Sequence, residues 1–232
     1  MIAFGEQAAE RLRKIESRGE ELARLTREIE ATRCALLAAG DKLSAKRAAA
    51  APKLAADVCR QLRDLGFKKS EFEIALAALE NPGPHGLEAV EFLFAPNPGE
   101  PLKPLKAIAS SGEISRVMLA VKSTLAGQDT VGLLVFDEID ANVGGEIAHT
   151  VGAKMRSLGE RHQVLCITHL PQVAAAAQSQ CVVTKEFRDE RTHSRLTAVE
   201  GEARVEEIAR MLGGKSESAL AHARELLKGQ AG

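Results

Sequence analysis

Apolar side chains recur every seven residues along the first part of the chain, at Ala8, Ile15, Leu22, Ile29 and Leu36. Charged residues fill many of the positions between them. A seven-residue repeat sustained over about four heptads is typical of a helix that pairs with another helix in a coiled coil. A solvated helix packed on a globular body is the alternative. A helix with so narrow an apolar stripe needs a partner helix, and no such partner is evident in this sequence.

The helical region is expected to consist of two helices. Gly40-Asp41 predicts a break, because glycine is a poor helix former. A second helix is expected over residues 42–65, ending at Gly66. We therefore divide the chain into a coiled-coil arm with its connecting helix, residues 1–65, and a second region, residues 66–232.

Composition excludes several classes of protein. The chain has 232 residues, 45% of them hydrophobic, and a formal net charge of −1, so it can form a sizeable core and is not uniformly basic. No apolar run reaches the roughly 18 residues that span a bilayer, and no signal peptide is expected. The four cysteines lack CxxC spacing, which excludes a zinc ribbon and favours reduced thiols. The chain has no Trp or Tyr, which disfavours a protein that binds single-stranded nucleic acid by stacking aromatic side chains on bases.

Strand-like and helix-like segments alternate after Gly66. This alternation predicts an α/β fold with a mostly parallel sheet and flanking helices. The run Val131–Phe136 is apolar throughout, as expected of a strand buried on both faces. The expected strands are 71–79, 87–95, 131–136, 163–168, 180–186 and 194–199, and the expected helices are 115–125, 145–158, a short one from 171, 203–212 and 217–228.

Polar residues that suit nucleotide chemistry occur at three points of this region. The apolar strand ends in Asp137-Glu138, where one carboxylate can hold Mg²⁺ and the other can orient an attacking water. Ser110-Ser111-Gly112-Glu113 precedes a helix, whose free N–H groups and dipole suit phosphate. His169 follows the strand 164–168, where its ring can reach a γ-phosphate.

Each of these three features is by itself more often structural: acids after a strand, an N-cap, or a hydrogen-bonded histidine. Their order along the chain is more informative. A Ser-x-Gly-Glu segment, an Asp-Glu-x-Asp segment and a Thr-His pair follow one another in the order of the signature motif, the Walker B motif with its D-loop, and the switch histidine of ABC-type ATPases.

Four stretches, residues 108–116, 136–140, 164–174 and 209–214, resemble the RecN family of SMC-like, ABC-type ATPases of bacterial double-strand-break repair. The run Thr168–Ala174 is the most specific of them. The resemblance implies an ABC-ATPase-like head portion preceded by a coiled-coil helix arm. It also implies ATP and Mg²⁺ as cofactors, a second head that closes around ATP, DNA bound by the complete protein, no membrane, and a place in the cytoplasm at the nucleoid.

The resemblance also implies roles for the residues at matching positions. Asp137 would help to hold Mg²⁺, and Glu138 would be the catalytic carboxylate. His169 would sense the γ-phosphate of ATP. Asp140 would lie in the D-loop beside the nucleotide.

The segment Ser110–Glu113 would be the signature motif, with Ser110 and Gly112 contacting nucleotide bound on the opposite head. Glu113 would complete the motif. The family usually has glycine at the position of Ser111. If this position requires a positive φ, the Cβ atom of serine would cost on the order of 1 kcal/mol.

The family's Walker A loop, which cradles the phosphates, has no credible counterpart in this sequence. We therefore expect the C-terminal portion of a longer protein, inactive alone and completed by a Walker-A-bearing half. Residues 209–216, which include Lys215, fit a relaxed P-loop pattern, but Val205 and Ile208 follow helical spacing. We interpret Gly213-Gly214 as a helix end and Ser216 as the cap of the next helix.

Two other functions fit parts of the sequence. One is a non-catalytic interaction module that pairs its long helix with another coil. The other is a small nucleotide kinase that uses Lys215, which would require strong ATP binding by this chain alone.

Overall fold

The computed structural model describes residues 2–188, 191–214 and 216–229. Contacts divide the chain into two compact units. The first unit contains the chain up to Pro52 together with Ala75–Glu91, and the second contains Lys53–Ile74 together with the residues from Phe92 onward. The long N-terminal helix and the β-hairpin that follows it are each divided between the two units, and the boundary at residue 65 stays a prediction.

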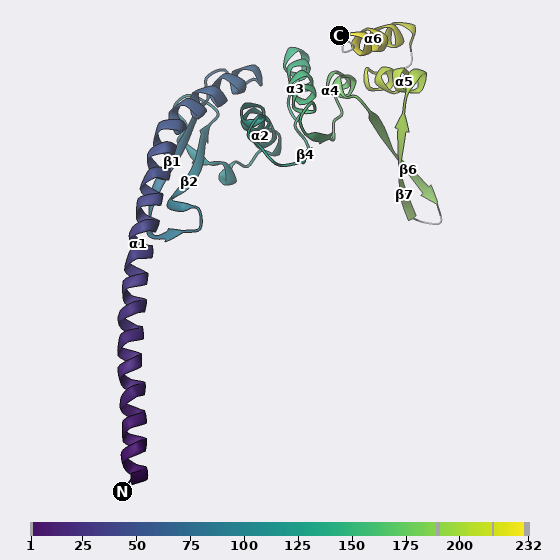
Figure 1. Cartoon of the computed structure of the whole chain (residues 1–232). Coiled ribbons are helices and arrows are strands. Elements are labelled where there is room, and N and C mark those ends of the chain that lie inside the picture. The colour runs from purple at the N-terminus through teal and green to yellow at the C-terminus, as the bar shows by residue number, and fades with distance from the viewer. Residues whose placement is uncertain (1, 189–190, 215, 230–232) are drawn as a thin grey trace. The chain divides into compact units, whose positions relative to one another are not determined.

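Helix α1 (Ile2–Asp64) is continuous, so the expected break at Gly40-Asp41 is wrong (Figure 1). Gly40 is buried inside the helix. A glycine in a helix interior costs only about 1 kcal/mol relative to alanine, and most of its neighbours in α1 are good helix formers. The helix also continues through Pro52. Tertiary packing at Gly40 explains why this position is glycine, as described below.

The seven-residue stripe of α1 faces solvent. Ile15, Leu22 and Ile29 have 64%, 65% and 66% of their surface exposed. The side chain of Ala8 lies outside the described residues. The prediction of a long N-terminal helix is confirmed, and its pairing in a coiled coil stays a prediction.

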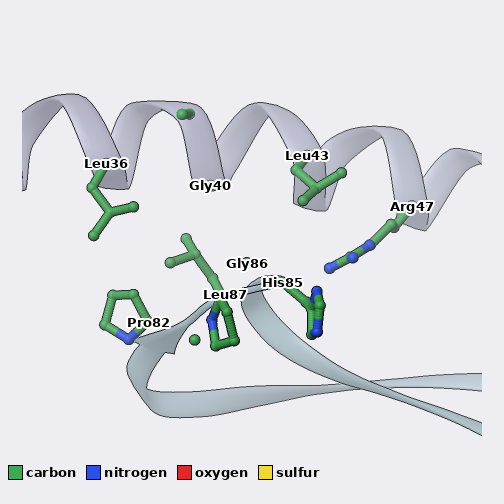
Figure 2. A pocket seen from close by; sticks show the side chains of 11 residues that line it. Leu36, Gly40, Leu43, Arg47, Pro82, His85, Gly86 and Leu87 are labelled. Carbon is green, nitrogen blue, oxygen red and sulfur yellow. The ribbon is translucent and has the colours of Figure 1, made fainter.

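A β-hairpin packs against α1 in the first unit. A hollow of about 390 Å³ lies between the hairpin tip and the helix, and Leu87 reaches across to Gly40, between Leu36 and Leu43 (Figure 2). A Cβ atom on Gly40 would lie 2.5 Å from Cγ of Leu87, so glycine permits this close approach. The hairpin strands are β1 (Glu71–Gly83) and β2 (Gly86–Ala95), and β3 (Lys103–Pro104) pairs with β2.

We expect Gly40→Leu to release the hairpin tip from α1, because the new side chain would occupy the space of Leu87. Amide hydrogen exchange at residues 82–88 should then increase. The matched control is Gly19→Leu, at a site where a Cβ atom meets nothing within 4 Å. Equal exchange in the two variants would show that the Gly40 contact does not hold the hairpin.

The second unit has its core between helices and a short parallel sheet. Strand β4 (Leu133–Phe136) pairs in parallel with β5 (Gln163–Cys166). Helices α2 (Ser111–Leu125) and α3 (Gly145–Leu158) contribute to the core, which also contains residues of α1. The largest fully buried side chains of this core are Leu62, Leu65, Phe94, Leu119, Ile139 and Leu158.

A second, smaller core lies towards the C-terminus, around the buried residues Ala175, Ile208, Ala209 and Ala223. None of the helices in the described ranges is both long and apolar enough to cross a membrane. The remaining elements of the second unit are a 3₁₀ turn before α2 (η1, Leu105–Ala107), α4 (Pro171–Ala176), the antiparallel pair β6 (Gln180–Arg188) and β7 (Arg191–Val199), α5 (Gly201–Met211) and α6 (Glu217–Lys228).

The α/β class is confirmed, with one difference in the sheets. The pair β4–β5 is parallel, whereas β2–β3 and β6–β7 are antiparallel, so the expectation of a mostly parallel sheet holds only at β4–β5. The expectation that Val131–Phe136 is buried on both faces is wrong. Leu134 and Phe136 are buried, but Leu133 and Val135 are 50% and 57% exposed, because only one face of this two-stranded sheet is covered.

The P-loop-like segment follows a helix and not a strand. Its first residues, 209–211, form the end of α5, and Gly213 and Gly214 have φ values of +110° and +150°, which suit a helix end. The Ser216 side chain caps α6 by accepting a hydrogen bond from Ala219 N at 3.2 Å. Lys215 lies outside the described residues. A strand–loop–helix arrangement, which a P-loop needs, is not formed by the described residues around it.

Candidate functional site

The sequence-predicted residues meet at the carboxyl ends of β4 and β5. Because the strands are parallel, their ends lie at the same edge of the sheet. Ile167 N donates a hydrogen bond to Phe136 O at 2.9 Å, which continues the pairing beyond the strands. Asp137 and Glu138 therefore follow one strand, and His169 follows the other, at one edge.

Glu138 has an unusual backbone conformation. Its φ is +53°, in the left-handed region that non-glycine residues rarely adopt. Such a conformation costs on the order of 1 kcal/mol or more, and it persists where the surrounding structure imposes it. The side chain is exposed. Strain of this kind at an exposed carboxylate, directly after a strand, is typical of a functional position.

The N-terminus of α2 contacts the same segment. Ser110 is the N-cap and accepts a hydrogen bond from Glu113 N at 3.3 Å. The Ser111 hydroxyl donates to the Glu138 carboxylate. Ser115, which the sequence analysis did not single out, donates from Oγ to the carbonyl oxygen of Asp137 at 2.8 Å. The two predicted motifs are thus joined by side-chain hydrogen bonds.

Ser111 does not need the conformation that would make serine costly. It is the first residue of α2, and the non-glycine residues with positive φ in the described part of the chain are Glu138 and Asn142. The critical glycine is Gly112. A Cβ atom there would lie 2.8 Å from Cβ of Ala141 and 3.0 Å from the carbonyl oxygen of Glu138. Gly112 is therefore required for the close approach of α2 to this loop.

Arg116, one turn further along α2, also holds this loop, a role that the sequence analysis missed. It is 8% exposed, and its Nη1 donates to the carbonyl oxygens of Ile139, at 3.4 Å, and Ala141, at 3.0 Å. Its guanidinium lies over the Phe67 ring, 5.1 Å from the centroid. Burial lowers the pKa of Arg116 from its ordinary value. The sequence offered one indication of this role, which is that Arg116 is a charged residue beside the buried apolar stripe of α2.

Asp140 is buried and bound within the chain. It is 2% exposed, and its Oδ2 accepts hydrogen bonds from the Thr168 hydroxyl, from His169 N at 2.8 Å and from Leu170 N at 3.2 Å. The Nδ1 atom of His169 lies 3.1 Å from the same oxygen, while 73% of the His169 side chain is exposed. A direct contact of Asp140 with nucleotide stays a prediction.

Cys166, the last residue of β5, is partly buried at this edge of the sheet. Burial raises the pKa of its thiol to about 12, and the charges of Asp140 and Asp137 contribute to the rise. The thiol therefore stays protonated at neutral pH and is not a candidate nucleophile.

The Asp137 carboxylate fits a magnesium ion whose other ligands are mostly waters and phosphate oxygens. Asp137 offers an exposed carboxylate. Among the described residues, no group of three or more His, Cys, Asp or Glu side chains could enclose a metal ion. Mg²⁺ usually keeps several waters and binds one or two carboxylates together with phosphate oxygens. The exposed carboxylate of Asp137 is compatible with this mode of binding, and Mg²⁺ at Asp137 stays a prediction.

Comparisons with known proteins give one consistent relationship. The chain is 44% identical over 230 residues to the DNA repair protein RecN of Deinococcus radiodurans, covering 99% of this chain and 40% of that protein. It is 49% identical over 187 residues to the RecN of Xylella fastidiosa strain Temecula1, covering 80% of this chain and 34% of that protein. No protein-family model matches the chain.

Among solved structures, the Smc head domain with a coiled coil and joint from Pyrococcus yayanosii aligns with a TM-score of 0.48 at 21% identity, covering 68% of this chain and 28% of that one. The chain is homologous to RecN proteins over nearly its whole length, and it spans about two fifths of the length of the first of them.

Proposed function

Because this chain is homologous to RecN DNA repair proteins, we propose that it supplies the signature, Walker B, D-loop and switch-histidine parts of an ATPase head that serves bacterial DNA repair. One observation carries this proposal: Glu138 is strained, exposed and hydrogen-bonded to Ser111. It lies at the sheet edge where β4 and β5 both end, and His169 follows β5 at that edge. A carboxylate, small-residue helix N-terminus and imidazole at one edge suit a nucleoside triphosphate.

Each residue has a defined role in the proposed reaction. The Asp137 carboxylate binds Mg²⁺, which when present neutralises phosphate charge. Glu138 orients the water that attacks the γ-phosphate and accepts its proton. His169 donates a hydrogen bond to a γ-phosphate oxygen.

The signature segment acts on nucleotide held mainly by another polypeptide. Ser110 and Gly112, with Ser111 and Glu113, contribute the N-terminal end of α2, whose N–H groups and dipole favour the negative charge of phosphate. In the complete protein this face meets ATP bound to a second head. Asp140 belongs to the loop between the two heads.

A Walker-A-bearing half has to complete the head. The exposed apolar face of β4–β5, which includes Leu133, Val135 and Leu165, supports this part of the proposal, because such a face is normally covered in an α/β sheet. We propose that the complete protein binds DNA in the cytoplasm, at the nucleoid, and couples ATP turnover to its hold on DNA.

Mixing tests the proposal directly. The chain is combined with a separately produced RecN N-terminal half that carries a Walker A motif, and ATP hydrolysis is measured with Mg²⁺. We expect turnover in the mixture and none with either part alone. A Walker A lysine variant of the added half is the control, since it removes phosphate binding. A mixture that forms a stable complex without hydrolysing ATP would contradict the proposal.

We expect Val135→Lys to abolish this restored activity without unfolding the chain. Val135 is 57% exposed, so the substitution should change the free energy of unfolding by no more than about 0.5 kcal/mol. A charge on the face that meets the Walker-A-bearing half should prevent assembly. The matched control is Val183→Lys on β6, which is 63% exposed. Equal ATPase activity in both mixtures would show that the β4–β5 face is not the contact.

The non-catalytic interaction module remains the second candidate. The observation in its favour is the exposed stripe of α1, which is available to a helical partner. Stable binding of a coiled-coil partner, together with no ATP turnover in any mixture, would favour it.

A further inference from the structure

A single oxygen atom of the Asp140 carboxylate accepts hydrogen bonds from three successive residues, 168–170, which include His169. Oδ2 of Asp140 accepts from the Thr168 hydroxyl and from the backbone N–H groups of His169 and Leu170, and Nδ1 of His169 lies 3.1 Å away. The Asp140 side chain is 3% exposed. A buried carboxylate with this many donors is held in one position.

The loop that carries Asp140 is itself fixed from α2. Arg116 binds the carbonyl oxygens of the residues on either side of Asp140, Ile139 and Ala141. Ile139 is fully buried. Asp140 therefore projects from a rigid support towards the His169 segment.

The contact between Asp140 and His169 bears on which ring nitrogen carries a proton. An ionised carboxylate only accepts hydrogen bonds, so an oxygen 3.1 Å from Nδ1 favours a proton on that nitrogen over a bare lone pair. In a neutral imidazole the other nitrogen, Nε2, is then without a proton. The rest of the ring is largely open to solvent, because 73% of the side chain is exposed.

We propose that Asp140 is a positioning residue, which holds His169 with Nδ1 protonated and leaves Nε2 as the nitrogen that meets a phosphate oxygen. The phosphate partner rests on the proposed function, whereas the proton position does not. A ring that donates from both nitrogens carries a second proton, taken from solvent, and the Asp140 carboxylate supplies the compensating negative charge. Asp140 thus acts through His169 and not by touching nucleotide.

The proton position can be measured on this chain without nucleotide. In a chain labelled with ¹⁵N-histidine, long-range ¹H–¹⁵N correlation spectra at a pH where the ring is neutral distinguish the two tautomers. The His169 signals are assigned from their loss in His169→Gln. We expect the Nδ1–H tautomer for His169 in the wild-type chain, and a shift towards Nε2–H in Asp140→Ala.

Thr168→Val is the matched control. It removes one hydrogen bond to the same carboxylate but leaves Asp140 beside His169, so the Nδ1–H tautomer should persist. An Nε2–H tautomer in the wild-type chain overturns the proposal without any variant, even if Asp140→Ala fails to fold. Retention of Nδ1–H in a folded Asp140→Ala chain also overturns it.

Activity in the mixture with the Walker-A-bearing half gives a second readout. Asp140→Ala should lower turnover as much as His169→Gln does, and the double variant should lose no more than about twofold beyond either one, because the two residues act as a unit. Additive losses would contradict the proposal. If the mixture shows no turnover while the tautomer is as expected, the proposed function fails and the positioning role of Asp140 stands.

Discussion

Replacing Glu138 by Gln is expected to slow ATP turnover by about 10²–10⁴-fold in the chain combined with a Walker-A-bearing half. The amide cannot accept the proton of the attacking water, but it has nearly the same shape as the carboxylate. The backbone at φ +53° and an acceptor for the Ser111 hydroxyl are both retained. The loss should therefore appear in kcat, with little change in ATP binding.

The measurement is steady-state ATP hydrolysis together with nucleotide binding by the same mixture. The matched control is Glu160→Gln, an exposed glutamate after α3 that has no contact with the site residues in the described hydrogen bonds. It should leave turnover unchanged. Near-normal turnover in Glu138→Gln would show that Glu138 does not accept the proton of the attacking water.

Replacing Gly112 by Val is expected to destabilise the chain by roughly 1–3 kcal/mol and to lower the activity of the mixture. The added Cβ would lie 3.0 Å from a backbone oxygen of Glu138 and 2.8 Å from Ala141. Backbone cannot rotate away as a flexible side chain can, and Arg116, which is also on α2, binds the carbonyl oxygen of Ala141 in this loop. Relief of the clash must therefore move α2 or displace Glu138.

Urea unfolding measures the stability change. Gly132→Val is the matched control, because a Cβ atom at Gly132 meets nothing within 4 Å. Ser111→Gly should not raise stability, since Ser111 is in ordinary helical backbone, where glycine relieves no strain, and the variant loses the hydrogen bond to Glu138. The same unfolding midpoint for Gly112→Val and Gly132→Val would show that the close approach of α2 to the loop is not needed.

Most elements of the fold could be predicted because their signals are local. The amphipathic stripe after Ser110, with Ser110 as its cap, predicted α2. The apolar runs predicted β4 and β5, and the parallel pairing then brings their ends to one edge. The helical spacing before Gly213-Gly214 also predicted that this segment is not a P-loop, and α5 confirms the interpretation.

Other features could not be predicted, because they depend on partners far apart in the sequence. Gly40 has the local pattern of a break, yet α1 continues through it, and only the contact with Leu87 explains the glycine. Apolar residues on both faces of β4 predict burial on both faces, but the number of layers that cover the strand is a tertiary property.

The sequence by itself determined where the two strands end, and thus that Asp137 and Glu138 follow one of them and His169 the other. This was possible because hydrophobic periodicity acts within a few residues of chain. Only the tertiary structure decided that Glu138 is strained, that Gly112 has no room for a side chain, and that Asp140 binds the His169 segment. These properties arise from contacts between residues about 25 or more positions apart. A local sequence pattern does not predict which distant residues will be in contact.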